Sequence, residues 1–155
     1  MNIQDYLIEQ RGKDWSDLLS GWMPALPPLF TLWLVNRFGD VFAVFEDGSV
    51  HRLDVGIGEI ERVADDRDHF ADQLNDDANA NNWLMIPLVD RCVAAGIHLG
   101  HNQCYGYKVP PILGGDYTVE NVAPMGLSAH YSFLADMYRQ TKNLADGTPI
   151  KIVIK

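Results

Sequence analysis

Cysteine is nearly absent from this sequence: among 155 residues, Cys92 and Cys104 are the only two. Two cysteines are too few for a disulfide framework, and they do not form the Cys-x-x-Cys spacing of structural zinc sites. Long apolar runs are missing as well, because no stretch approaches the roughly 18 consecutive apolar residues of a membrane-spanning helix. Residues 1–10 lack the basic start and apolar run of a signal peptide. We therefore expect reduced thiols, no membrane partner and a cytosolic location.

Basic residues are scarce relative to acidic ones. The 12 lysines and arginines are outnumbered by 21 aspartates and glutamates, so the formal net charge is −9. Proteins that grip nucleic acid through its phosphates need a positive surface, and this composition argues against direct nucleic-acid binding of that kind. The 47% hydrophobic and 21% charged residues are typical of a globular domain. The length, with no internal repeat or low-complexity segment, predicts one domain over residues 1–155.

The first half of the chain predicts a short helical segment followed by a sheet. In residues 1–23, apolar side chains recur three or four positions apart between glycines, which predicts two short helices. A proline-rich connector follows, with Pro24, Pro27 and Pro28. Four runs of branched and aromatic residues separated by turn residues then predict an antiparallel meander: residues 32–38, 41–45, 50–53 and 59–63. Residues 41–45 are apolar throughout and predict the central strand, and Asp47-Gly48 predicts a two-residue hairpin turn.

Helices are predicted for the second half. Asp65 or Asp66 caps the first, with Phe70 and Leu74 on its inner side. Pro87 starts the next, which ends at Gly96 and faces four apolar side chains inward: Leu88, Val89, Cys92 and Val93. Ser128 caps the last long helix, which Asp146-Gly147 ends before a final strand at residues 150–154. This order predicts an α+β fold, a single domain whose antiparallel sheet of about four strands is flanked by helices.

The aromatic side chains form two groups. Seven of them match the spacing of buried faces and are predicted core: Trp15, Trp22, Phe30, Trp33, Phe38, Phe42 and Phe45. Tyr105, Tyr107 and Tyr117 instead alternate with glycines and prolines, close to a predicted tight turn at Gly114-Gly115. A rigid loop that presents tyrosines is a common interaction surface, and support of the turn from within the core is the alternative. Both interpretations are open at this level.

Acidic residues are concentrated between Asp65 and Asp77, in and after the helix predicted to begin at Asp65 or Asp66. Six aspartates stand here against the single basic residue Arg67: Asp65, Asp66, Asp68, Asp72, Asp76 and Asp77. One interpretation is a solvated helix face that keeps the protein soluble. The other is a surface that attracts a basic partner, because complementary charge speeds association and disfavours wrong partners.

A metal site or a Cys/His enzyme is the competing class of function. His98, His101 and Cys104 follow an H-x-x-H-x-x-C spacing, and imidazole and thiolate are ligands that zinc prefers. The glycines around them favour a loop, in which three-residue steps do not share a face. Cys104 with a histidine as base would make a small hydrolase, although no nucleophile signature surrounds it. We expect no catalytic residue, no metal and no cofactor, and retain this hydrolase as the alternative.

One block of sequence carries a family resemblance. It runs from Leu99-Gly100 through Cys104-Tyr105-Gly106-Tyr107 to Leu113-Gly114-Gly115-Asp116-Tyr117, and is followed by Glu120-Asn121 and a helix from His130 to Gln140. With the predicted turns at Phe38-Gly39-Asp40 and Asp47-Gly48 and the Phe70 helix, this pattern resembles the C-terminal domain of type VI secretion immunity proteins over about residues 27–147. More distantly, the predicted fold is similar to that of SMI1/KNR4-type immunity proteins.

The resemblance implies an inhibitor rather than an enzyme. Proteins of this kind act in the cytosol and bind a cognate toxin, often a nuclease, so that the producing cell survives. On this interpretation, the six aspartates and the three tyrosines are candidate contacts to a basic toxin, which is neutralised by occlusion without a cofactor. A regulatory scaffold that meets another protein through the tyrosines is the remaining alternative.

Overall fold

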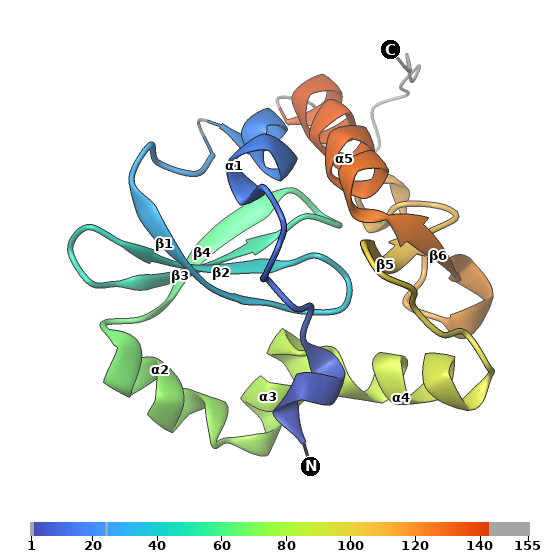
Figure 1. Cartoon of the computed structure of the whole chain (residues 1–155), viewed down its shortest axis with the longest axis horizontal. Helices are drawn as coiled ribbons and strands as arrows, with labels where there is room; N and C mark the ends of the chain where they lie inside the picture. The colour runs from blue at the N-terminus through green and yellow to red at the C-terminus, as the bar shows by residue number, and fades with distance from the viewer. Residues whose placement is uncertain (1, 24, 143–155) are drawn as a thin grey trace.

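The computed structural model describes residues 2–23 and 25–142, which form an α+β domain (Figure 1). The main sheet contains β1 (Phe30–Val35), β2 (Val41–Phe45), β3 (Val50–Asp54) and β4 (Glu59–Ala64), and a separate pair contains β5 (Gln103–Tyr107) and β6 (Val122–Gly126). The α-helices are α1 (Trp15–Leu18), α2 (Arg67–Leu74), α3 (Asp77–Trp83), α4 (Ile86–Ala94) and α5 (Leu127–Thr141). Single 3₁₀ turns occur at Ile3–Tyr6, Ser20–Trp22, Pro111–Leu113 and Val119–Asn121. Within the described ranges, no helix has both the length and the apolar character needed to cross a membrane.

The main sheet is the predicted meander, with its strands hydrogen-bonded in the order β1-β2-β3-β4. The central position of β2 is confirmed, because its alternate residues enter different hydrophobic clusters: Val41 and Ala43 in one, Phe42 and Val44 in the other. Helices α1 and α5 lie along one face of the sheet, and α2 and α3 lie along the other (Figure 1). The apolar run in this strand is therefore explained by cover on both sides.

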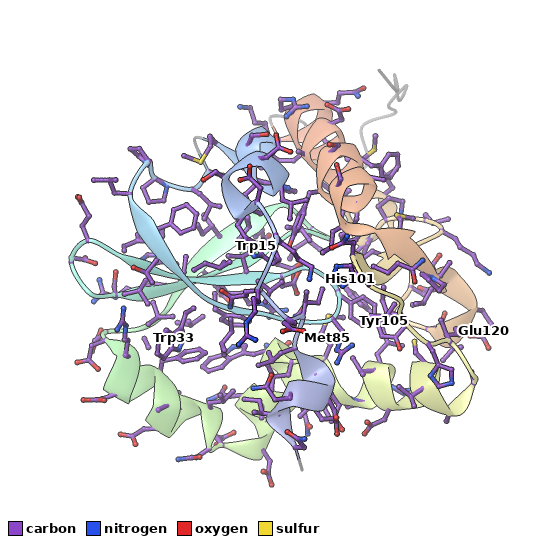
Figure 2. All side chains as sticks on the ribbon, viewed as in Figure 1. Trp15, Trp33, Met85, His101, Tyr105 and Glu120 are labelled. Carbon is purple, nitrogen blue, oxygen red and sulfur yellow. The ribbon has the colours of Figure 1, made fainter. Side chains whose placement is uncertain are left out.

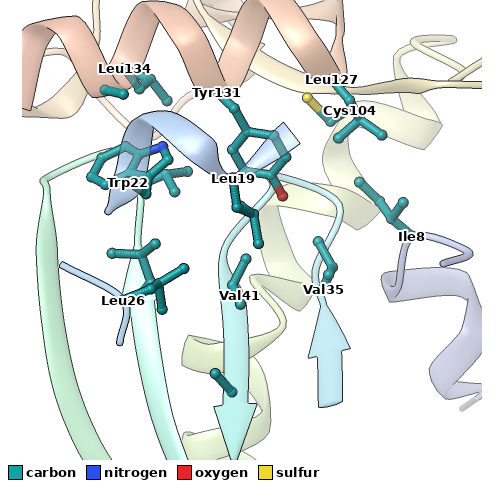
Figure 3. Close-up of a cluster of buried hydrophobic side chains, with 14 residues drawn as sticks. Ile8, Leu19, Trp22, Leu26, Val35, Val41, Cys104, Leu127, Tyr131 and Leu134 are labelled. Atoms are coloured by element: carbon teal, nitrogen blue, oxygen red, sulfur yellow. The ribbon is translucent and has the colours of Figure 1, made fainter. Parts of the chain in front are cut away.

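Helix α5 is fixed on the first face by both apolar and polar contacts. Tyr131 and Leu134 pack with Trp22 and Val41 in the larger hydrophobic cluster, which Figure 3 shows between α5 and the strands. The Tyr131 hydroxyl also donates to the carbonyl of Gly39 at 2.8 Å. Because this bond ties α5 to the turn between β1 and β2, the last described helix closes the core over the first hairpin.

Helices α2 and α3 are held on the second face by three aromatic rings. Phe70 of α2 and Trp83 of α3 are stacked with centroids 5.2 Å apart, and both contact Phe42 of β2. At the edge of the sheet, the Arg67 guanidinium lies 4.7 Å from the ring centroid of Trp33, which Figure 2 shows between β1 and α2. Aromatic pairs of this kind add to the burial of apolar area. The two helices are thereby fixed relative to the sheet.

The tyrosine segment corrects one prediction. Tyr105 and Tyr107 do not lie in a loop; they belong to β5, which pairs antiparallel with β6, and they are 2% and 5% exposed. Both rings contact Phe38, in a cluster that also contains Val89 of α4. Because both side chains are buried, neither offers a surface to a partner. For these two tyrosines, the alternative prediction holds, in which they support the structure from within the core.

The hairpin between β2 and β3 also differs from the prediction. Its loop has three residues rather than two, because Phe45 and Ser49 are the pair that closes it, with the amide of Phe45 donating to the carbonyl of Ser49 at 2.9 Å. Gly48 has a φ of +88°, whereas Asp47 does not adopt a positive φ. A tight turn followed by one left-handed glycine is the usual three-residue hairpin loop. The turn residue was identified correctly and the loop length was not.

Predictions of burial and of helix boundaries are corrected at several positions. Trp33 is 38% exposed because a bulge in β1 interrupts its alternation, and Val93 of α4 is 48% exposed on the outer side of its helix. Helix α5 begins at Leu127, with Gly126 rather than Ser128 at its N-cap. The predicted cap at Asp66, the place of Pro87 in the first turn of α4 and the stop at Gly96 are confirmed. Pro24, Asp146-Gly147 and the strand predicted at 150–154 lie outside the described residues.

Candidate functional site

The six aspartates of the acidic stretch are all exposed and lie within or directly before two short helices rather than one. We call them the acidic face: Asp65, Asp66, Asp68, Asp72, Asp76 and Asp77. The chain turns between α2 and α3 because Asn75 and Asp76 end the first helix and the Asp76 carboxylate begins the second. The acidic face therefore follows the outer side of a helix pair whose inner side carries Phe70 and Trp83.

The six carboxylates do not all have the same role. Asp66 accepts from the amide of His69 and caps α2, and Asp76 accepts from the amides of Ala78 and Asn79 and caps α3. Asp65 forms an exposed ion pair with Arg62 at 3.1 Å. The other three, Asp68, Asp72 and Asp77, have no side-chain hydrogen bond or ion pair within the described residues. Their charge is therefore available to a partner.

A pocket begins one helical turn beyond Asp77. It has a volume of about 240 Å³, and Arg52 and Asp54 of β3 form its polar wall. Its remaining lining includes Asn81, Asn82, Met85, Leu88, Arg91 and Tyr117. Asn81 follows Asp77 by four residues on α3, so the two side chains lie on the same side of that helix. We call this hollow the Asp54 pocket; it adjoins the acidic face.

A buried charge network forms the inner wall of the Asp54 pocket. Arg52 donates from Nη2 to Asp40 Oδ2 at 2.9 Å, and the same nitrogen lies 3.7 Å from Asp54 Oδ2. Asp40 also accepts from the Asn36 side chain and from the amide of Val55. Two carboxylates thus share one guanidinium in a part of the molecule from which water is largely excluded. The wall carries an excess of negative charge when both carboxylates are ionised.

The carboxyl group of Asp54, which lines the pocket, has a strongly raised pKa. Burial and the nearby charge of Asp40 raise the pKa of Asp54 to about 7, against the opposing effects of Arg52 and of two backbone amides. Those amides belong to Gly56 and Ile57, at 3.0 and 3.3 Å from Oδ1. A carboxyl that titrates near neutral pH in a hollow is typical of functional sites. The pattern that could have revealed it is the charged pair Arg52 and Asp54, two residues apart at the end of the strand predicted for residues 50–53.

Tyr117, unlike Tyr105 and Tyr107, lies at the surface. It is 47% exposed and its ring contacts Tyr107 edge-on, with centroids 6.0 Å apart. The loop that carries it is closed by Asn121, whose side-chain amide donates to the carbonyls of Val109 and Asp116 and accepts from the amide of Val109. The structure therefore brings Tyr117 to the Asp54 pocket and leaves the other two tyrosines in the core.

Gly115 permits this loop to close, and its replacement is our first prediction. A Cβ at this position would lie 1.7 Å from the carbonyl oxygen of Val109, which is backbone and cannot move aside easily. We expect Gly115→Ala to open the loop and to lower the free energy of unfolding by about 1–3 kcal/mol in chemical denaturation. Gly126→Ala is the control, because a Cβ there meets no atom within 4 Å. Equal losses in the two variants would contradict this role for Gly115.

A second, larger depression has the opposite charge. It has a volume of about 800 Å³ and is formed by the N-terminal segment, β1 and the loop before β5. Arg11, Lys13 and Arg37 line it, and Glu9 is its one acidic lining residue. A basic partner would be repelled from this region and attracted to the acidic face. Charge is thus distributed unevenly over the molecule, although the net charge is strongly negative.

The predicted Cys/His arrangement is not assembled. Cys104 is buried in the core beside α5, and burial raises the pKa of its thiol well above the ordinary value. His98 and His101 are exposed. Within residues 2–23 and 25–142, no group of three His, Cys, Asp or Glu side chains could hold a metal ion. The residues singled out for this alternative therefore do not meet.

One Ser-His-Asp group does occur, in the hairpin between β2 and β3. The Ser49 hydroxyl lies 2.5 Å from Asp47 Oδ1 and 2.9 Å from His51 Nε2. In a catalytic triad the histidine lies between serine and carboxylate, whereas here the serine is in the middle. Ser49 is also 1% exposed. This group stabilises the turn and is not arranged for nucleophilic attack.

Comparison with known proteins shows a similarity to one family. Residues 64–138 match the family model described as T6SS immunity protein Tdi1, C-terminal. The fold is similar to that in the crystal structure of Atu4351 from Agrobacterium tumefaciens, with a TM-score of 0.51 and 19% sequence identity over 77% of this chain. The chain spans 60% of the length of that protein's chain. No curated protein matches the sequence. Residues 64–138, which include the acidic face, are thus similar to the C-terminal region of type VI secretion immunity proteins.

Proposed function

We propose that this protein binds a basic toxin through the acidic face and neutralises it by covering its functional surface. The observation that carries the proposal is that Asp68, Asp72 and Asp77 are exposed and have no partner within the described residues, on helices fixed to the sheet by Phe70 and Trp83. Charges presented on a rigid support lose little freedom on binding. We place the encounter in the cytosol, in keeping with the free, buried cysteines Cys92 and Cys104.

A nuclease is the class of toxin that this surface fits best. A nuclease must attract the phosphates of its substrate and therefore presents positive charge around its active site. The acidic face offers carboxylates along two helices, and so would compete for the same positive surface. Such complementarity raises the rate of association by about 10- to 1,000-fold at low salt. Binding there would exclude the nucleic acid without any chemical change in either protein.

Co-expression tests the function directly. The chain is produced with each neighbouring reading frame in turn, and the growth of the cells and the proteins that copurify with it are recorded. We expect one neighbour to be toxic alone, harmless together with this chain, and captured by it. If growth is not restored beside any toxic neighbour, the proposed neutralisation is wrong. Restored growth without capture of the toxin would contradict binding as its cause.

Charge reversal tests the acidic face, and is our second prediction. The triple variant Asp68→Lys, Asp72→Lys and Asp77→Lys removes carboxylates that form no side-chain hydrogen bond or ion pair in the described structure, so the fold should persist. We expect association with the captured toxin to slow by about 10- to 100-fold at low salt and to lose most of its salt dependence. The rate is measured by stopped flow or surface plasmon resonance between about 50 and 300 mM salt.

A second triple variant provides the matched control. Glu9→Lys, Asp17→Lys and Glu120→Lys change the net charge by the same amount at exposed positions outside the acidic face. Glu120 lies at the opposite side of the molecule from α2 (Figure 2). If both triple variants slow association equally, overall charge rather than the acidic face governs binding. Circular dichroism establishes that both remain folded.

A further inference from the structure

We propose that the Asp54 pocket receives a single basic side chain, lysine or arginine, of the toxin, with its charge placed against the Asp54 carboxylate. This inference rests on the proposed function, because it assigns to the bound toxin one anchoring residue. The pocket adjoins the acidic face through α3, so one partner surface can contact both. Interfaces commonly derive most of their affinity from a few residues that fill such hollows.

The size of the pocket favours a side chain over a free ligand. Its volume of about 240 Å³ is below the roughly 300–1,000 Å³ of typical small-molecule sites. Met85, Leu88 and the ring of Tyr117 provide apolar wall area for the stem of a long side chain. A lysine or arginine uses such walls for its methylene groups and places only its charged end among polar atoms. The tyrosine ring can also lie against a cation.

The charges at the inner wall favour a cation. Arg52 is already paired with Asp40 at 2.9 Å, whereas Asp54 lies 3.7 Å from the same nitrogen. The Asp54 side chain is 19% exposed, which leaves it accessible from the pocket. An incoming cation would pair with this second carboxylate and relieve its repulsion with Asp40. When Asp54 is ionised, Asp40 and Asp54 together carry one more charge than Arg52 balances, and a bound cation would supply the missing positive charge.

Arg91 is the one charged group of the lining that opposes a cation. It is exposed on α4 and has no ion pair within the described residues, so its charge is screened by solvent at the entrance. Tyr107, in the core behind the pocket, and Tyr117 are both neutral, since burial raises the pKa of each phenol. The groups that decide the charge of the site are therefore Asp40, Arg52, Asp54 and Arg91.

The backbone at the pocket is held in an uncommon conformation. Met85, which joins α3 to α4, has a φ of +53° and is one of two non-glycine residues with positive φ in the described ranges. The strain is located where the side chain enters the lining of the pocket. Non-glycine residues in this region persist when the surrounding structure fixes them, and they are concentrated at binding sites. The strained residue thus belongs to the apolar wall of the pocket.

A small probe tests the pocket without the toxin, and is our third prediction. N-acetyl-arginine methylamide is titrated into the protein, and the NMR signals of the Met85 methyl group and the Tyr117 ring are followed. We expect saturable shifts with a millimolar dissociation constant at pH 8, and binding weaker by more than about tenfold at pH 5.5, where Asp54 is protonated. The uncharged citrulline analogue should not shift these signals.

Two variants with opposite expected effects make the test specific. Asp54→Asn should weaken binding of the probe by about tenfold and remove its pH dependence, whereas Arg91→Ala should strengthen it. Asp116→Asn is the control, because it removes an exposed carboxylate next to Tyr117 in the sequence that is not part of the pocket. Full binding to Asp54→Asn, equal shifts with the citrulline analogue, or preference for acetate as probe would overturn the inference.

The outcome is separable from the proposed function. If co-expression restores growth but the arginine probe does not bind, the pocket inference is wrong and the acidic face alone remains as the contact. If the probe binds as expected but no toxic neighbour is neutralised, the proposed function is wrong and the cation pocket remains. Reduced affinity of Asp54→Asn for the captured toxin, with unchanged affinity of Asp116→Asn, would support both.

Discussion

Replacement of Asp40 by alanine is expected to lower the free energy of unfolding by about 3–5 kcal/mol. Asp40 is 1% exposed and accepts from Arg52, from the Asn36 side chain and from the amide of Val55. Its removal leaves a buried guanidinium without its principal partner, because the other nearby carboxylate, Asp54, lies 3.7 Å away. The loss is measured by urea denaturation monitored by tryptophan fluorescence at pH 7.

A double variant separates the buried charge from simple loss of packing. If an unpaired Arg52 is the cause, then Asp40→Ala combined with Arg52→Met should be more stable than Asp40→Ala alone, because an apolar side chain of similar length replaces the stranded charge. A double variant less stable than either single variant would indicate that packing around Asp40 dominates. A loss below about 1 kcal/mol in Asp40→Ala would contradict the importance of the network itself.

Replacement of Asp54 by asparagine is expected to stabilise the protein at pH 8 and to leave it nearly unchanged at pH 4. Burial and Asp40 raise the pKa of Asp54 from 3.8 to about 7. Between these values the folded chain keeps a proton that the unfolded chain has released, so the free energy of unfolding falls as pH rises. Across this window the fall is on the order of 2–4 kcal/mol. Asparagine does not ionise, so the variant does not lose this stability as the pH rises.

Denaturation curves at several pH values between 4 and 8 check this expectation. The difference in stability between Asp54→Asn and the parent should grow with pH and level off above about pH 7. The asparagine oxygen can still accept from the amides of Gly56 and Ile57, so the local turn is retained. A constant difference across the range would show that Asp54 does not titrate as described. Asp54→Asn is therefore expected to be more stable than the parent at pH 8 and to bind the arginine probe more weakly. A gain in stability with a loss of binding is common where a binding site is built from unfavourably placed groups.

Much of the main sheet could be predicted from sequence because its pairing is local. Each strand of the meander pairs with its neighbour in the chain, and Gly48 marks one turn. The pair β5-β6 could not be predicted in the same way. Its strands are separated by a long loop, and each contains a residue that is unfavourable in strands, Gly106 and Pro124. Their pairing depends on Asn121 and on the core beneath, neither of which a local pattern reveals.

The candidate site shows the same division. The acidic face can be predicted from the sequence because its residues fall within one short stretch, although the roles of Asp66 and Asp76 as helix caps emerge only from the structure. The Asp54 pocket could not be predicted from the sequence, since its lining comes from β3, the α3-α4 junction and the loop of Tyr117. Its inner charge network includes Asp40, which adjoins the turn before β2. Three distant segments must fold before this site exists.

The acidic face separates the residues that hold the helices from those that are free to change. Asp66 and Asp76 cap α2 and α3, so their replacement weakens the fold. Asp68, Asp72 and Asp77 make no side-chain hydrogen bond or ion pair within the described residues. Asp68 and Asp77 stand in the first turns of their helices, where a negative charge contributes about 0.3–1 kcal/mol, so their replacement costs less than the loss of a cap. On the proposed function, the gene could therefore follow a drifting toxin through these three codons while its product stays folded. Partner choice and stability can evolve independently on the same two helices.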